Sequence, residues 1–262
     1  MTISIMKNNR TNKLPKTVVS LLVAIFWICV WQIICIAVGS SIIVASPLQT
    51  AKRAFELAAT QNFWLCVFNS IWHVLSGFTV AVISSIILAA LTSRFHFLYQ
   101  LFLPILKLIK ATPVASFIIL ALFWLKGSVV PFIAFLMVLP LVFTNLSQGF
   151  LNVDCSLLEM ADVYGFSFFK KVRLIYIPSL MPYFVAACST GLGFAWKAGI
   201  AAEVIGLPKN SLGMEIYNAK IYIETVDLFA LTAVIIILSV VMEKAFMLLL
   251  KKLSKKILKG GV

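Results

Sequence analysis

The sequence predicts an all-α integral membrane protein with six transmembrane helices. Of its 262 residues, 62% are hydrophobic and 12% are charged, and the mean hydropathy is +1.05. Soluble domains carry roughly 25% charged residues, so this composition excludes an ordinary soluble protein. Apolar runs of about 20 residues recur along the chain, and such a run crosses the hydrocarbon core as a helix.

The first apolar run has no charged residue from Thr17 to Gly39. It is longer than the roughly 7–15 apolar residues of a signal peptide, so we expect it to remain as a membrane span. An amphipathic surface helix is expected around Pro47 and Glu56. The six expected spans are residues 17–39, 63–92, 110–126, 128–148, 180–205 and 227–250.

Residues 93–112 separate the second and third expected spans. This interval is apolar, but Pro104 interrupts it, and Arg94 and Lys107 lie too close together in sequence for a span between them. We expect an interfacial or partly buried helix that leads into the third span.

Basic residues predict the orientation. With both termini in the cytoplasm, the inner segments, with Lys107 and Lys110 among them, hold fifteen Lys and Arg residues and the outer segments hold five. This asymmetry follows the positive-inside rule. Residues 1–16 are then a cytoplasmic tail, 152–178 a cytoplasmic loop and 251–262 a basic cytoplasmic tail. The net charge of +13 is thus explained by basic residues at the helix ends and in the tails, where they adjoin membrane lipid. We expect no nucleic acid as partner.

The cytoplasmic loop has the pattern of two short helices. Ser156 and Glu159 have the spacing of a capping box for a helix that starts at the next residue, Leu157. Gly165 can end that helix in the left-handed conformation, and Ser167 can cap a second helix that ends before Pro178. Apolar residues fall on or near one face of the first helix, and three phenylalanines follow the glycine. These are Leu157, Leu158, Ala161 and Tyr164, and then Phe166, Phe168 and Phe169.

Such a helix pair outside the membrane can have either of two roles. It can dock into a groove of a partner protein through apolar anchors. It can also lie on the membrane, with Lys170, Lys171 and Arg173 facing lipid headgroups.

Two charged residues fall inside the fifth expected span, where a charge costs at least about 2.5–3.5 kcal/mol. Lys197 can attract an anionic solute, or it can form an ion pair with Glu203 or with a neighbouring helix. Glu203 is expected to stabilise the outer loop that follows the span. Gly193 and neighbouring small residues can line a path or a dimer seam, or pack closely within one subunit.

A family resemblance rests on the loop. Its residues read E-M-A at 159–161, G at 165 and I-x-I-P at 175–178. This pattern resembles the EAA loop of permease subunits in ATP-binding-cassette (ABC) importers, which reads E-A-A, three residues, G, nine residues, I-x-L-P. The segments A-W at 195–196, A-E-V at 202–204 and S-L-G at 211–213 are similar to the nitrate, sulfonate and taurine branch of that family.

The resemblance implies a type I permease fold in the bacterial cytoplasmic membrane. It implies a homodimer around a central path, two cytoplasmic ATPases that bind ATP and Mg²⁺, and an extracytoplasmic solute-binding protein. This chain has no G-x-x-x-x-G-K-[ST] phosphate-binding loop, so we expect it to hold no cofactor, metal or catalytic residue. The ATPase-coupling residues would be Leu157, Leu158, Glu159, Ala161, Gly165, Phe168, Phe169, Ile175 and Pro178. The path candidates would be Gly193, Trp196, Lys197 and Glu203.

The expected function is therefore to carry a small anionic or polar organic solute across the membrane for an ATP-driven importer. The alternative is a secondary transporter or channel that an ion gradient drives. That alternative predicts internal repeats with paired broken helices and carboxylates near the midplane of the membrane.

Overall fold

Residues 16–259 are described in this computed structural model, and within that range the chain forms helices and no strand. Nearly all of the expected N-terminal tail and the last three residues of the C-terminal tail lie outside the described range. The helices are α1 (Lys16–Val38), α2 (Pro47–Ala58), α3 (Gln61–Arg94), α4 (His96–Ala111), α5 (Val114–Leu125), α6 (Val129–Leu151), α7 (Cys155–Val163), α8 (Phe168–Lys171), α9 (Ile177–Gly206), α10 (Leu212–Ile221) and α11 (Thr225–Lys259).

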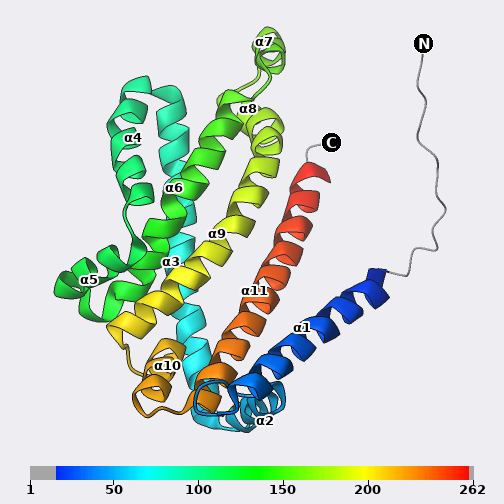
Figure 1. Ribbon diagram of the computed structural model, residues 1–262. Coiled ribbons are helices and arrows are strands. Elements are labelled where there is room, and N and C mark those ends of the chain that lie inside the picture. Colours follow the sequence, from blue (N-terminus) through cyan, green and yellow to red (C-terminus); the bar gives the residue numbers. More distant parts are fainter. Residues whose placement is uncertain (1–15, 260–262) are drawn as a thin grey trace, which may run out of the picture.

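Among the described helices, five continuous ones are long and apolar enough to cross a membrane, and the pair α4–α5 makes a sixth if it counts as one span. Figure 1 shows α3, α6 and α9 side by side, with α11 next to α9 and α1 outermost. The short helices α2 and α10 lie at one end of the bundle, and α7 lies beyond the other end. The fold class predicted from sequence is confirmed.

Glycines permit the closest contacts between the central helices. A Cβ atom on Gly77 of α3 would lie 2.1 Å from the carbonyl oxygen of Pro131 in α6. A Cβ atom on Gly199 of α9 would lie 2.4 Å from a methyl group of Val74 in α3. Since apolar burial gives no large driving force between helices in lipid, such close backbone approach supplies packing contacts that hold the bundle together.

The third expected span is not one straight helix. The helix α5 has 12 residues, which is too short to cross the hydrocarbon core, and it meets α4 at an angle of 106°. The bend follows from Pro113, which disfavours helical geometry at the preceding residue, and Thr112 is accordingly extended (φ −83°, ψ 133°). The helix α4, expected to be interfacial or partly buried, is partly buried and runs back along α6 (Figure 1).

This arrangement also moves Lys110 away from the inner segment to which the charge pattern assigned it. The residue lies at the end of α4, and its Nζ donates a hydrogen bond of 2.8 Å to Oγ1 of Thr144, within α6. Thr144 lies well before the end of α6. Lys110 is therefore tied to the side of α6 and not to the end of that helix.

The expected amphipathic surface helix is α2. Ser46 and Gln49 form a reciprocal capping box at its start. Arg53 binds both carboxylate oxygens of Asp227 in α11, at 2.7 and 2.9 Å, and these hydrogen bonds raise the pKa of its guanidinium further above its usual value. This pair fixes α2 against the start of α11.

Candidate functional site

The helix α7 begins with an aspartate cap. Asp154 is the N-cap residue, and its Oδ1 accepts a hydrogen bond of 2.8 Å from the backbone amide of Ser156. The helix therefore starts at Cys155, two residues before the expected start at Leu157. The expected capping box of Ser156 and Glu159 is wrong because the Asp154 carboxylate, one of the strongest N-cap groups, takes the orphan amide first.

The end of α7 is a Schellman motif. Gly165 is left-handed at φ +62°, as expected from its place in the sequence. Its amide binds the carbonyl of Asp162 at 3.0 Å, and the amide of Phe166 binds the carbonyl of Ala161 at 2.8 Å. The two bonds satisfy carbonyls that a helix end leaves free, and Phe166 packs back toward Ala161 in the same apolar cluster.

The second helix of the loop does not stop before Pro178. A continuous helical segment runs from Phe168 to Gly206, through a π-helical turn at Val172–Tyr176. The π turn directly precedes Pro178, which has no amide donor and crowds the carbonyl four residues earlier. The exposed loop is thus joined to the membrane span α9 by an unbroken helix.

A small core holds α7 against the start of α9. Val153, Ala161 and Ile175 are buried together, and Leu158, Phe166 and Tyr176 pack against them. Leu158 and Ala161 therefore point inward and do not share an exposed face with Leu157 and Tyr164, contrary to expectation. Two residues of the EAA-like pattern, Ala161 and Ile175, serve to orient the segment.

The outward side of α7 and α8 is strongly apolar. Phe168 and Phe169 are 71% and 82% exposed, and Val163 is 86% exposed. We call this surface the coupling face; it consists of Leu157, Met160, Val163, Tyr164, Phe168 and Phe169. Glu159 lies exposed beside it, and Pro178 is half-buried in α9. Figure 1 shows α7 standing clear of the bundle, so the coupling face is free to meet a partner.

Basic residues border the coupling face and are partly engaged within the loop. The ammonium of Lys170 lies 3.9 Å from the ring centroid of Phe166. Lys171 forms an ion pair with Asp162 and so links α8 to α7. These contacts assign Phe166 to the small core and leave Phe168 and Phe169 outside it.

A pocket of about 530 Å³ lies between α4, α5, α6 and α9. Its wall is mostly apolar, from side chains such as Leu136, Met137 and Phe194. The charged side chains that line it are Lys110 from α4 and Lys197 from α9. We call it the lysine pocket. An apolar cavity with two ammonium groups suits a small anion that carries apolar or polar substituents.

Among the residues described here, none forms an ion pair with Lys197. The ion pair considered for Lys197 and Glu203 is absent, because the Glu203 carboxylate binds other groups. Of the four path candidates, Lys197 lines the lysine pocket. Gly193 is half-buried on the same helix with open space beside it, while Trp196 is buried and donates to the carbonyl of Ile235 in α11 at 3.2 Å.

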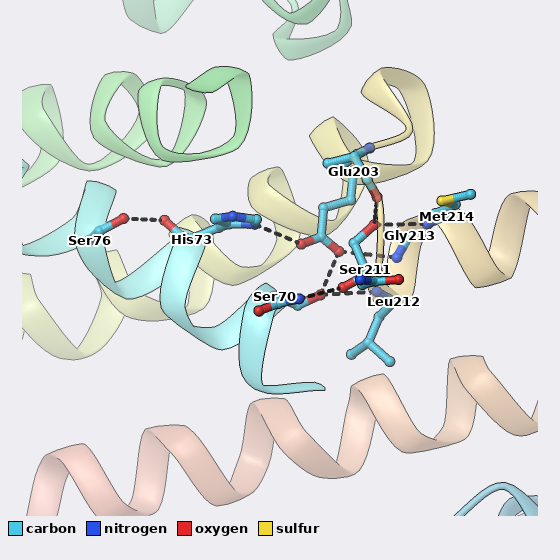
Figure 2. Close-up of polar contacts among 11 residues, drawn as sticks. Ser70, His73, Ser76, Glu203, Ser211, Leu212, Gly213 and Met214 are labelled. Atoms are coloured by element: carbon cyan, nitrogen blue, oxygen red, sulfur yellow. Dashed lines mark hydrogen bonds and ion pairs between the residues drawn. The ribbon is translucent and has the colours of Figure 1, made fainter. Parts of the chain in front are cut away.

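Glu203 is fully buried and joins three helices (Figure 2). Its Oε2 accepts hydrogen bonds from the Ser70 hydroxyl of α3 at 2.8 Å and from the Gly213 amide of α10 at 3.0 Å. The Ser70 oxygen in turn accepts from the Leu212 amide at 3.0 Å. A carboxylate at a helix N-terminus is favoured by the helix dipole. These hydrogen bonds connect Glu203 to the start of α10, in the loop that it is expected to stabilise.

Gly213 makes this arrangement possible. A Cβ atom there would lie 2.3 Å from Cβ of Glu203 and 2.6 Å from the backbone nitrogen of Val204. The first turn of α10 therefore lies directly on α9. His73 is near the same carboxylate, with Nδ1 at 3.9 Å from Oε1 of Glu203, too far for a hydrogen bond.

The class of protein is decided by the similarity of this sequence to a known family. Residues 81–259 match the family of binding-protein-dependent transport system inner membrane components. The chain belongs to this family. The matched range includes the coupling face, the lysine pocket and Glu203 with its α10 partner Gly213, while Ser70 lies before it.

Relatives within the family share about a quarter of their residues with this permease chain. A probable ABC transporter permease of Brucella melitensis is 26% identical over 78% of this chain and 83% of its own length. The nitrate import permease NrtB of Synechocystis is 24% identical over 81% of both chains. The putative aliphatic sulfonates permease SsuC of Bacillus subtilis is 24% identical over 87% of this chain and 83% of its own.

Proposed function

We propose that this chain is the permease subunit of an ABC importer in the bacterial cytoplasmic membrane, and that it carries a small anion. Two copies form the path, two cytoplasmic ATPases bind the coupling faces, and an extracytoplasmic binding protein delivers the solute. ATP and Mg²⁺ bind to the ATPases. Both termini and the coupling face lie on the cytoplasmic side.

The lysine pocket is the observation that carries the choice of solute. Two ammonium groups in an apolar wall are costly without counter-charges, and no carboxylate lines the pocket. The Lys110 ammonium donates a hydrogen bond to the Thr144 hydroxyl, while Lys197 has no hydrogen-bond or ion-pair partner among the described residues. A bound sulfonate, nitrate or similar anion supplies the missing negative charge. Relatives named for nitrate, sulfonates and taurine support this class.

The position of the pocket on one subunit supports the proposed homodimer. Phe194 lines the pocket and is 52% exposed, and Gly193 beside it leaves open space. A second copy that packs on this side of α9 would close the pocket into a central path.

Replacement of Lys197 by glutamine tests the proposed solute class. The change keeps a polar side chain and removes its charge, so ATP-driven uptake of labelled nitrate, taurine or ethanesulfonate should fall about tenfold or more. Lys110→Gln should also lower uptake, by a smaller factor because its hydrogen bond to Thr144 ties it partly to the protein.

Lys107→Gln is the matched control, since Lys107 is exposed on α4 and does not line the pocket. It should leave uptake unchanged. Wild-type uptake in the Lys197→Gln variant, with the complex intact by size-exclusion chromatography, would refute a role of the pocket in anion transport.

A further inference from the structure

A second pocket, of about 340 Å³, lies between the turn from α3 to α4 and the end of α6. Its lining is more polar than that of the lysine pocket, and the two share no residue. The polar side chains that line it are Thr92, Ser93, Arg94, His96, Tyr99 and Ser147. No carboxylate lines it, so its fixed charge is positive.

The pocket lies at the ends of two long apolar helices. The long apolar helix α3 ends at Arg94, and the apolar helix α6 ends at Leu151, which also lines the pocket. Both helix ends are at the α7 end of the bundle in Figure 1. Arginine and tyrosine at the ends of spans are typical of the membrane–water boundary, where phosphate groups of lipids are concentrated.

Several donors at the pocket are unused. No residue in the range 16–259 pairs with the Arg94 guanidinium. The Oγ atom of Ser147 is buried and has no hydrogen-bond partner among the described residues. The first amides of α4 receive no side-chain cap from Phe95. An unpaired buried hydroxyl is costly, and Ser147 lines the same pocket as the unpaired Arg94, so both groups point to a ligand that completes the site.

Three of the remaining polar side chains are already engaged, and the Tyr99 hydroxyl is a further group with no hydrogen-bond partner among the described residues. The hydroxyls of Thr92 and Ser93 donate to carbonyls of their own helix. The ring of His96 contacts the amide of Gln100 at 3.1 Å and stacks on Tyr99. The free capacity is therefore that of donors, from Arg94, Ser147 and the start of α4, which together suit an acceptor-rich anion.

We propose that this pocket binds a phosphate group, either the headgroup phosphate of an anionic phospholipid or free phosphate. Arg94 pairs with two phosphate oxygens, the start of α4 donates its amides, and Ser147 donates its hydroxyl. The bound phosphate ties the α3–α4 turn to the end of α6. Since α7 follows α6 after three residues, the ligand also steadies the base of the coupling face. The site is separate from the path for solute and goes beyond the proposed function.

Thermal unfolding of the full-length chain in an uncharged detergent tests the proposal. Short-chain phosphatidylglycerol, phosphatidylcholine with the same acyl chains, and sodium phosphate are titrated separately. Phosphatidylglycerol or phosphate should raise the unfolding temperature of the wild type in a saturable way. Arg94→Gln should raise the half-saturating concentration about tenfold or more, since it removes a charge-assisted contact.

Two further variants separate binding from simple stability. Lys107→Gln removes a positive charge from α4 outside the pocket and should bind as the wild type does. Ser147→Ala should leave the unfolding temperature without ligand unchanged or higher, because its hydroxyl has no partner, and it should still weaken the response to ligand.

The titrations also identify the source of the phosphate. A response to phosphatidylglycerol alone assigns the site to lipid, and a response to sodium phosphate of equal size assigns it to the free ion. The proposal is overturned if the wild type responds to neither, or if Arg94→Gln responds to the ligand as the wild type does.

Discussion

Replacement of Phe169 by serine should abolish most of the coupling between this permease and its ATPase. The ring is 82% exposed on the coupling face, and its ring contact is with Phe168, which is also exposed. Because the ring is mostly exposed, its loss leaves the fold of α7 and α8 intact. Aromatic anchors in a groove typically contribute 2 kcal/mol or more to a protein interface. Such a loss weakens ATPase binding by roughly 30-fold.

The measurement is the amount of ATPase that co-purifies with the solubilised permease, together with ATP-driven uptake. Phe55→Ser is the matched control, because Phe55 is 79% exposed on α2 at the opposite end of the bundle. It should retain the full complement of ATPase. Equal recovery of ATPase with the Phe169→Ser variant would show that the coupling face is not the docking site.

Replacement of Glu203 by alanine should produce the largest loss of stability. The change leaves the Ser70 hydroxyl and the Gly213 amide without their acceptor in a fully buried place. Each unsatisfied group costs about 1–3 kcal/mol. Because α10 is held to α9 and α3 through this carboxylate, we expect the variant to unfold at a markedly lower temperature and to transport poorly.

Glu203→Gln keeps one acceptor oxygen and should lose less stability than Glu203→Ala. Glu243→Ala, at an exposed position of α11, serves as the control and should unfold close to the wild-type temperature. If Glu203→Ala unfolds at the same temperature as Glu243→Ala, the network in Figure 2 does not hold α10 in place.

The spans were largely predictable, because hydrocarbon requires long apolar helices and these are visible in the sequence. The exception is the region of α4 and α5. An apolar segment between Arg94 and two lysines is typical of an interfacial helix, and only its packing along α6 places Lys110 at Thr144. The useful signal was Pro113, which predicts a break before α5.

The helices and turns of residues 152–178 were predictable in outline and less so in detail. The left-handed Gly165 follows from backbone sterics, which act locally. The inward direction of Leu158 and Ala161 depends on Val153 and Ile175, which approach them only in the folded chain. Asp154 and Ser156 are both good capping residues, and the local sequence pattern alone did not decide which of them caps α7.

The sites within the bundle depended most on long-range contacts. The role of Glu203 was expected, but its partner Ser70 lies 133 positions away in the sequence. Trp196 was expected at the path together with Lys197, the next residue in the sequence. Adjacent residues of a helix point about 100° apart, and this separates a tryptophan that faces α11 from a lysine that faces the pocket.

ATP-dependent uptake in proteoliposomes tests the central claim most directly. The permease is reconstituted with the ATPase and binding protein that co-purify with it, and uptake of labelled nitrate, taurine and ethanesulfonate is followed with and without internal ATP, and with ionophores that collapse proton and sodium gradients. The account predicts that uptake of at least one anion requires ATP and binding protein and persists with the ionophores. Uptake by the permease alone, driven by an ion gradient and independent of ATP, would contradict it.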